Sequence, residues 1–181
     1  MKILVCPLSK VDDLVAEHRP ARVISLLDPD RTFPELGDDY SGRHLRLRFH
    51  DITIPAPDRV MPGTEHIQEF LHFLDDWNET DVLLIHCRAG ISRSTAAAYI
   101  AACYLHPDRD EQEIALELRR ASALARPNGT LVRLADEIMG RAGRMTAAIE
   151  DSGRDLEWIE INEAEPFLLQ IANNRSGMRF E

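Results

Sequence analysis

The most informative segment of this chain reads Val82-Leu83-Leu84-Ile85-His86-Cys87-Arg88-Ala89-Gly90-Ile91-Ser92-Arg93-Ser94. The uninterrupted apolar run at its start is typical of a central strand that is buried on both faces. From Arg93 to about Leu105 the chain is rich in alanine, which predicts a buried helix. A strand, a short loop and a helix are therefore expected in succession, with a cysteine and an arginine at the two ends of the loop.

The segment from Cys87 to Arg93, called the 87–93 loop below, has the features of an anion-binding loop. Successive backbone N–H groups in a tight loop form a concave site for negative charge, and the first turn of the following helix adds its free N–H groups and positive dipole. Gly90 permits backbone angles that a larger residue resists, and the Arg93 guanidinium can bind two oxygens of one phosphate. The same positive field favours the thiolate of Cys87, which is a nucleophile. The loop thus predicts in-line attack by Cys87 on a bound phosphate, a reaction that needs mostly positioning and charge stabilisation.

The nine residues from His86 to Ser94 resemble the signature loop of the protein tyrosine phosphatase superfamily, in which His-Cys is followed by five residues, an arginine and a serine or threonine. Ser92 and the absence of bulky residues resemble the dual-specificity branch. A weaker similarity in the order of elements extends from about residue 45 to 141, and the chain after 145 lies outside it.

The resemblance implies a role for each residue of the loop. Cys87 is the nucleophile, Arg93 binds phosphate, Ser94 assists breakdown of the phospho-enzyme, and His86 holds the loop and tunes the thiolate. The phosphate-binding residues implied in this way are Arg88, Ala89, Gly90, Ile91, Ser92 and Arg93.

A general acid is also needed, because protonation of the leaving group is typically worth about two to four orders of magnitude in rate. In this superfamily the acid is an aspartate on a loop upstream of the cysteine. Asp51 matches that description because it follows a predicted strand at 45–49 and begins a proline-rich loop at 51–63. Asp58, on the same loop, is the alternative. An isolated aspartate after a strand is usually a turn or cap residue, so the assignment depends on the 87–93 loop.

The rest of the chain alternates predicted strands and helices, which indicates an α/β fold. We expect a small, mostly parallel central sheet flanked by helices, like that of protein tyrosine phosphatases. The further strands are predicted at 3–6 and 22–27, and the further helices at 9–18, 64–77, 110–124 and 128–141. The candidate helix caps are Ser9, Thr64, Asp110 and Asn128. Residues 1–145 are interpreted as a phosphatase domain, and 146–181 as a C-terminal extension that is helical and docked or partly disordered.

Composition limits the classes of partner and compartment. The chain has 181 residues and a formal net charge of -10, which argues against broad binding to nucleic acid or to anionic membranes. Its first apolar run is too short for a signal peptide or a membrane span, and a sparse, odd set of three cysteines favours a reducing compartment, so we expect a cytoplasmic protein. No His or Cys cluster has zinc-like spacing, and we expect neither a metal nor another cofactor. Cys6 and Cys103 are interpreted as core residues, although either could form a disulfide with an oxidised Cys87.

These observations predict a metal-independent phosphatase that hydrolyses phosphate monoesters through a cysteinyl-phosphate intermediate. Phosphotyrosine in proteins is the expected substrate, with phosphoserine and phosphothreonine also considered. Two alternatives remain open: a phosphatase that acts on phosphoinositides or RNA, and a phosphatase-like module that binds phosphorylated partners without turnover. The complete set of nucleophile, arginine and hydroxyl favours catalysis.

Overall fold

A five-stranded sheet forms the centre of the computed structural model, which describes residues 1–153 and 161–172. The strand order is β3-β2-β4-β1-β5, with β5 antiparallel to β1 and the other pairs parallel. The predicted mostly parallel sheet flanked by helices is therefore confirmed. The strands are β1 (Lys2–Pro7), β2 (Arg22–Leu27), β3 (His44–Arg48), β4 (Val82–Cys87) and β5 (Phe167–Gln170).

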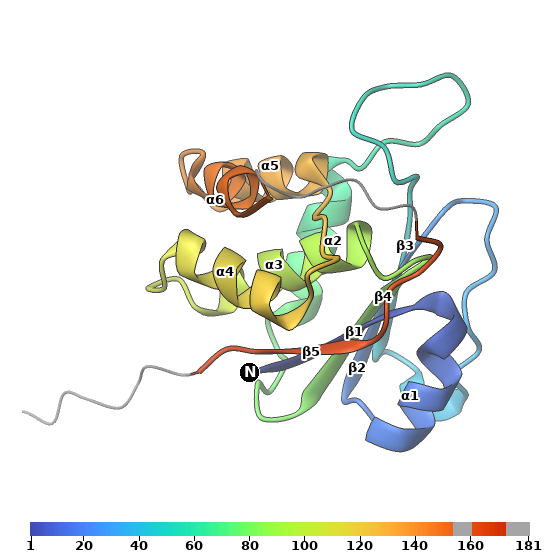
Figure 1. Cartoon of the computed structure of the whole chain (residues 1–181). Helices are drawn as coiled ribbons and strands as arrows, with labels where there is room; N and C mark the ends of the chain where they lie inside the picture. Colours follow the sequence, from blue (N-terminus) through green and yellow to red (C-terminus); the bar gives the residue numbers. More distant parts are fainter. Residues whose placement is uncertain (154–160, 173–181) are drawn as a thin grey trace, which may run out of the picture.

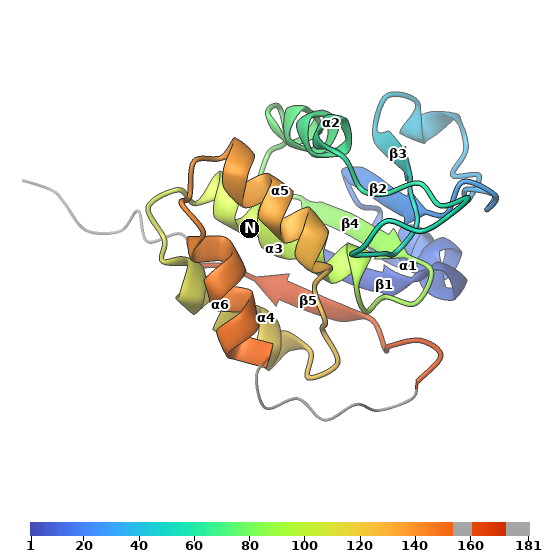
Figure 2. The same cartoon turned by 90° about the horizontal axis from the view of Figure 1, so that it is seen from above.

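Helices cover both faces of the sheet, but unequally (Figure 1). Helix α1 (Val11–His18) packs on one face over a small apolar cluster that includes Val11, Val23 and Leu84. The other face carries the main core and the remaining α-helices, as the view from above also shows (Figure 2). These helices are α2 (Thr64–Leu74), α3 (Arg93–Leu105), α4 (Glu111–Ala121), α5 (Gly129–Ile138) and α6 (Arg144–Gly153). Two short 3₁₀ turns, η1 (Leu8–Lys10) and η2 (Asp38–Tyr40), lie in the connections.

Two of the four predicted caps are confirmed. The Asp110 carboxylate accepts hydrogen bonds from the N–H groups of Gln112 and Glu113, and the Asn128 side chain accepts one from Leu131 N. The predictions for Ser9 and Thr64 are wrong. Ser9 lies in the turn η1 before α1 and donates to the Glu163 carboxylate, while Thr64 is the first residue of α2 and follows its N-cap.

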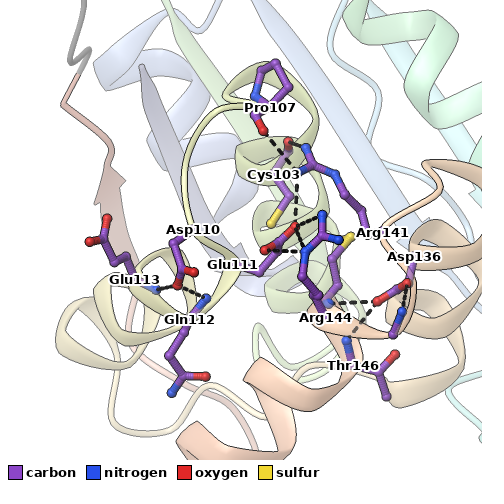
Figure 3. Close-up of polar contacts among 12 residues, drawn as sticks. Cys103, Pro107, Asp110, Glu111, Gln112, Glu113, Asp136, Arg141, Arg144 and Thr146 are labelled. Carbon is purple, nitrogen blue, oxygen red and sulfur yellow. Dashed lines mark hydrogen bonds and ion pairs between the residues drawn. The ribbon is translucent and has the colours of Figure 1, made fainter.

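Helix α6 is fixed to α4 and α5 by buried charges (Figure 3). The Glu111 carboxylate, whose side chain is 6% exposed, accepts hydrogen bonds from Arg141 and Arg144. The Asp136 carboxylate accepts from the backbone N–H groups of Gly143, Met145 and Thr146, which are otherwise unpaired donors at the start of α6. The boundary placed at 145 from the sequence therefore falls inside a helix that packs on the preceding ones.

The chain after α6 differs from the helical extension that the sequence suggested. Residues 167–170 form the edge strand β5, with Leu169 buried opposite Ile3 and Leu168 exposed. An apolar segment pairs here because β1 would otherwise present unpaired N–H and C=O groups at the sheet edge. Residues 173–181, part of the stretch for which disorder was weighed, lie outside the described residues. Within the described part of the chain, no helix combines the length and apolar character needed to cross a bilayer.

Candidate active site

The 87–93 loop connects the carboxyl end of β4 to the amino end of α3. Cys87 is the last residue of β4 and lies beside Pro7 of β1 and Leu26 of β2 in the parallel register. Arg93 is the first residue of α3 and is buried. The predicted order of strand, loop and helix is therefore present, and the loop lies at the end of the sheet where α/β folds bind ligands.

The Cys87 sulfur has two polar neighbours inside the loop. The Gly90 N–H donates to Sγ over 3.3 Å, and Ser94 Oγ lies 3.2 Å from Sγ. Both contacts stabilise negative charge on sulfur when the hydroxyl donates. The structure therefore brings Cys87 and Ser94 together as the resemblance implied.

Four carbonyls of the loop point away from the anion site because other segments bind them. The donors are backbone N–H groups from the turn η1 that follows β1, from the chain before β5 and from the connection between α4 and α5. The pairs are Leu8 N to Arg88 O (3.2 Å), Ala164 N to Ala89 O (2.9 Å), Arg126 N to Ile91 O (2.8 Å) and Asn128 N to Ser92 O (3.3 Å). With its carbonyls held outside, the loop keeps its N–H groups available for an anion.

Gly90 is required by both its conformation and its surroundings. Its φ is +73°, and a Cβ built on it would lie 2.9 Å from Pro7 N and 3.0 Å from the Cys6 carbonyl carbon. Both atoms belong to the backbone of β1, so a side chain at this position would push the loop away from the strand. The predicted role of glycine here is explained by this close approach as well as by φ.

Arg93 is held from one side. Its Nη1 donates to Asp28 Oδ1 over 2.8 Å and to the Phe49 carbonyl over 2.7 Å. Because both hydrogens of Nη1 are then used, Nε and Nη2 form the edge that remains for a ligand, and Nε has no hydrogen-bond partner among the described residues. Asp28 directly follows β2, and this position after a strand is the one signal in the sequence of its role.

Asp51 lies at the same pocket and is held by two donors. Ser92 Oγ and Asn128 Nδ2 donate to its Oδ1 over 2.7 and 2.8 Å, while its Oδ2 lies 3.9 Å from Arg93 Nε. The second oxygen is therefore the one that faces the anion site. Asn128 was predicted only as a helix cap, so its contact with Asp51 was missed.

The pocket has a volume of about 350 Å³, and its lining contains Cys87 at the base. The lining residues are Asp28, His50, Asp51, Ile52, Ala56, Arg59, Cys87, Arg88, Ala89 and Arg93. Asp58 is not among them and has a left-handed conformation with φ 57°.

His50 closes the loop that carries Asp51. The backbone N–H of His50 donates to the Val60 carbonyl over 2.9 Å, and the ring Nδ1 of His50 accepts a hydrogen bond from Val60 N over 2.8 Å. These bonds place Arg59, the residue before Val60, in the pocket that Asp51 also lines. Neither His50 nor Arg59 was predicted from the sequence as a site residue.

The other cysteines and His86 lie apart from the pocket. Cys6 belongs to the apolar cluster under α1, whereas Cys87 belongs to the main core on the opposite face of the sheet. Burial, with a smaller effect of Cys87, raises the pKa of Cys6 to about 12, and burial raises that of Cys103 to about 12. His86 pairs in register with Cys6 and Ser25, so its ring lies on the α1 side. Among residues 1–153 and 161–172, no three His, Cys, Asp or Glu side chains are grouped to hold a metal ion.

No protein-family model matches the sequence, and a search of curated proteins also finds no match. Solved structures do match. The Yvh1 phosphatase domain from Chaetomium thermophilum is 19% identical with a TM-score of 0.55, over 79% of this chain and 93% of that one. The human tyrosine phosphatase-like serine/threonine/tyrosine-interacting protein is 18% identical with a TM-score of 0.58, over 77% and 92%. PTPMT1 in complex with PI(5)P is 17% identical with a TM-score of 0.55, over 77% and 94%.

At these identities the matches establish the fold. The chain has the architecture of protein tyrosine and dual-specificity phosphatases, as the resemblance of the 87–93 loop implied. The roles of individual residues depend on the geometry described above and on the chemistry it permits.

Proposed function

We propose that this protein is a metal-independent phosphatase that hydrolyses phosphate monoesters through a phosphorylated Cys87. The observation that carries the proposal is the arrangement around Cys87 Sγ, with the Gly90 N–H at 3.3 Å and Ser94 Oγ at 3.2 Å, at the base of a pocket that Arg93 and Asp51 also line. Nucleophile, anion site and proton donor thus lie in one pocket.

In the first step the phosphate binds to the N–H groups of the 87–93 loop and to the Nε and Nη2 edge of Arg93. The Cys87 thiolate attacks phosphorus in line, and the bond from phosphorus to the leaving oxygen breaks. Preorganised donors stabilise the charge on the three equatorial oxygens without rearrangement. Asp28 contributes indirectly because it fixes the orientation of the guanidinium.

Asp51 acts on the leaving group. Its Oδ2 carries the proton that the leaving oxygen takes, while Oδ1 remains bound by Ser92 and Asn128. In the second step the Asp51 carboxylate accepts a proton from water, which attacks phosphorus and releases the Cys87 thiolate. Ser94 Oγ, in contact with Sγ, stabilises the thiolate as it leaves.

Phosphotyrosine in proteins is the proposed substrate, with phosphoserine and phosphothreonine as related possibilities. A second candidate class is a substrate with additional negative charge, such as a phosphoinositide. Arg59 and Arg88 favour it because both are exposed and line the pocket together with Arg93 in a chain whose net charge is -10. The similar PTPMT1 structure holds PI(5)P, which makes this lipid a suitable probe.

The proposal is tested by hydrolysis of p-nitrophenyl phosphate and of a phosphotyrosine peptide in the presence of EDTA. We expect the wild type to turn over both, Cys87→Ser to be inactive, and Asp51→Asn to lose at least about tenfold in kcat. Asp58→Asn is the matched control on the same loop and should retain activity. Full activity in Asp51→Asn with loss in Asp58→Asn would reassign the acid.

Two outcomes would change the proposed function itself. Binding of the phosphopeptide without turnover of any phosphate ester would favour a phospho-ligand binding module. A kcat/KM for PI(5)P well above that for the peptide, reduced by Arg59→Ala and Arg88→Ala without loss on p-nitrophenyl phosphate, would favour the phosphoinositide class.

A further inference from the structure

A row of polar side chains crosses three neighbouring strands on the α1 side of the sheet. In the parallel register, Ser25 of β2 lies between Arg46 of β3 and His86 of β4, and His44 lies beside Val23. Ser25 Oγ is 2.7 Å from His44 Nε2 and 2.5 Å from His86 Nε2. At the outer end, Arg46 Nε donates to His44 Nδ1 over 3.2 Å. The row leads from the exposed Arg46 to His86, the residue before Cys87.

The donor and acceptor in each hydrogen bond of the row can be assigned in order, starting from Arg46 at its exposed end. Arginine only donates, so His44 Nδ1 is an acceptor. Burial, with a further contribution from Arg46, lowers the pKa of His44 to about 4, so at neutral pH its single ring proton is on Nε2 and is donated to Ser25 Oγ. The Ser25 hydrogen then has His86 Nε2 as its acceptor.

The other tautomer of His86, with the proton on Nε2, would leave the buried Ser25 hydroxyl without an acceptor. If His86 Nε2 carried the proton, Ser25 Oγ would accept from both rings, and its own hydrogen would have no acceptor among the described contacts. Ser25 is fully buried, and an unsatisfied buried hydroxyl costs about 1–3 kcal/mol. His86 is also neutral at pH 7, since burial lowers its pKa to about 3. The nearby Cys87 backbone opposes this effect, and the charge of Arg93, with that of His44 when it is protonated, reinforces it.

We infer that Arg46, His44 and Ser25 are positioning residues that fix His86 in the tautomer with hydrogen on Nδ1. That atom is buried and has no partner at ordinary hydrogen-bond distance among the described residues. The backbone of Cys87 is the adjacent polar group that interacts with the His86 ring, and it raises the pKa of the ring. The row therefore presents a fixed donor to the start of the 87–93 loop.

The consequence for reactivity depends on the proposed function. The Cys87 backbone begins the loop whose N–H groups bind phosphate, so a fixed donor beside it helps hold the sulfur and the loop in position. Without the Ser25 hydroxyl, His86 is free to adopt either tautomer. The effect on rate should correspond to one hydrogen bond, about threefold to tenfold.

Nitrogen-15 NMR of the histidine rings tests the tautomers without requiring turnover. In the wild type at pH 7 we expect the Nδ1–H form of His86 and the Nε2–H form of His44. In Ser25→Ala we expect a mixture of both His86 tautomers. In Ser25→Thr, which keeps a hydroxyl, His86 should remain in the Nδ1–H form. In Arg46→Met we expect a mixture of both His44 tautomers. In Arg46→Lys, which keeps a donor, His44 should remain in the Nε2–H form. A wild-type His86 with its proton on Nε2 would overturn the inference.

The second measurement is the rate of Cys87 alkylation by iodoacetamide at pH 7, together with kcat on p-nitrophenyl phosphate. Cys6 and Cys103 are buried with pKa values of about 12, so the alkylation rate reports on Cys87. We expect both rates to fall about threefold to tenfold in Ser25→Ala and to recover in Ser25→Thr, with the thermal midpoint showing that both variants fold. Unchanged rates in folded Ser25→Ala would refute the positioning role. If the tautomers and the alkylation rates are as expected but the protein turns over no phosphate ester, the positioning role is supported and the proposed function fails.

Discussion

Asn128 Nδ2 donates a hydrogen bond to Asp51 Oδ1 over 2.8 Å, although the two residues are 77 positions apart. The same Asn128 side chain accepts from Leu131 N and so caps α5 with its oxygen. One side chain thus connects a helix start to the candidate general acid. Its two functions can be separated because they use different atoms.

Asn128→Ser should lower kcat on p-nitrophenyl phosphate about tenfold with little change in thermal stability. Serine keeps a capping oxygen but has no amide to hold Asp51, and misplacement of a catalytic group reduces the rate. Asp110→Ser, the same kind of cap replacement at α4, is the control and should leave kcat unchanged. Full kcat in Asn128→Ser would show that Asp51 does not depend on this contact.

Asp28 should matter as an acceptor for Arg93 more than as a charge. Asp28→Ala leaves Nη1 with the Phe49 carbonyl alone, so the guanidinium loses its fixed orientation, and we expect kcat/KM to fall at least about tenfold. Asp28→Asn keeps an oxygen acceptor and should stay within about threefold of the wild type. Steady-state kinetics on p-nitrophenyl phosphate decide the point, and equal losses in both variants would contradict it.

Gly90 and Gly42 form a matched pair, because both have φ +73° but only Gly90 is closely packed. Alanine at Gly42 meets no atom within 4 Å and should cost about 1 kcal/mol of unfolding free energy from φ alone, with activity retained. Alanine at Gly90 adds the contact with the β1 backbone, so we expect a loss of about 2–4 kcal/mol and of activity. Denaturant unfolding and activity measured on both variants test the comparison, and similar losses at both sites would contradict it.

The partly buried His44 and the buried His86 should make the fold sensitive to acid. The pKa values of His44 and His86 lie at about 4 and about 3 in the native protein, below the ordinary 6.5. Below pH 6.5 the unfolded chain therefore binds protons that the native state does not, and stability falls as the pH decreases. Between pH 6.5 and 5 each should contribute a loss of about 1–2 kcal/mol, the lower figure applying to the partly exposed His44.

Urea unfolding across this pH range measures the effect. His44→Gln should flatten the dependence on pH, whereas His72→Gln, at a side chain that is 86% exposed, should not. An identical slope in His44→Gln and the wild type would be incompatible with a lowered pKa of His44 in the native state.

Glu111 should be the most important charge for the packing of α4 against α6 (Figure 3). Glu111→Gln leaves the buried Arg141 without its carboxylate, and breaking a buried ion pair from one side costs about 3 kcal/mol. Glu113→Gln, on the same helix but with a side chain that is 63% exposed, should cost less than about 1 kcal/mol. Urea unfolding of the two variants checks this, and equal losses would show that burial of the network is unimportant.

Several features of the fold were predictable because they are local. Each of these features depends on residues close together in the sequence. They are the apolar run of β4, the alanine-rich helix α3 and the caps Asp110 and Asn128. The position of β5 was not predictable from its apolar residues, because a short apolar run suits a helix or a strand equally, and the vacant edge of β1 selects the strand.

The sequence alone specified the 87–93 loop, its strand and helix, and the identities of Cys87, Arg93 and Ser94, because these residues are contiguous and their chemistry is carried by their spacing. The tertiary structure alone decided which distant residues complete the site. Asp28, His50 and Arg59 reach the pocket through strand ends and loop closure, and Asn128 reaches Asp51. Through strand register, His44 contacts Ser25 and Ser25 contacts His86. Register arises from the packing of whole strands, and a shift of one residue would turn Ser25 to the opposite face of the sheet.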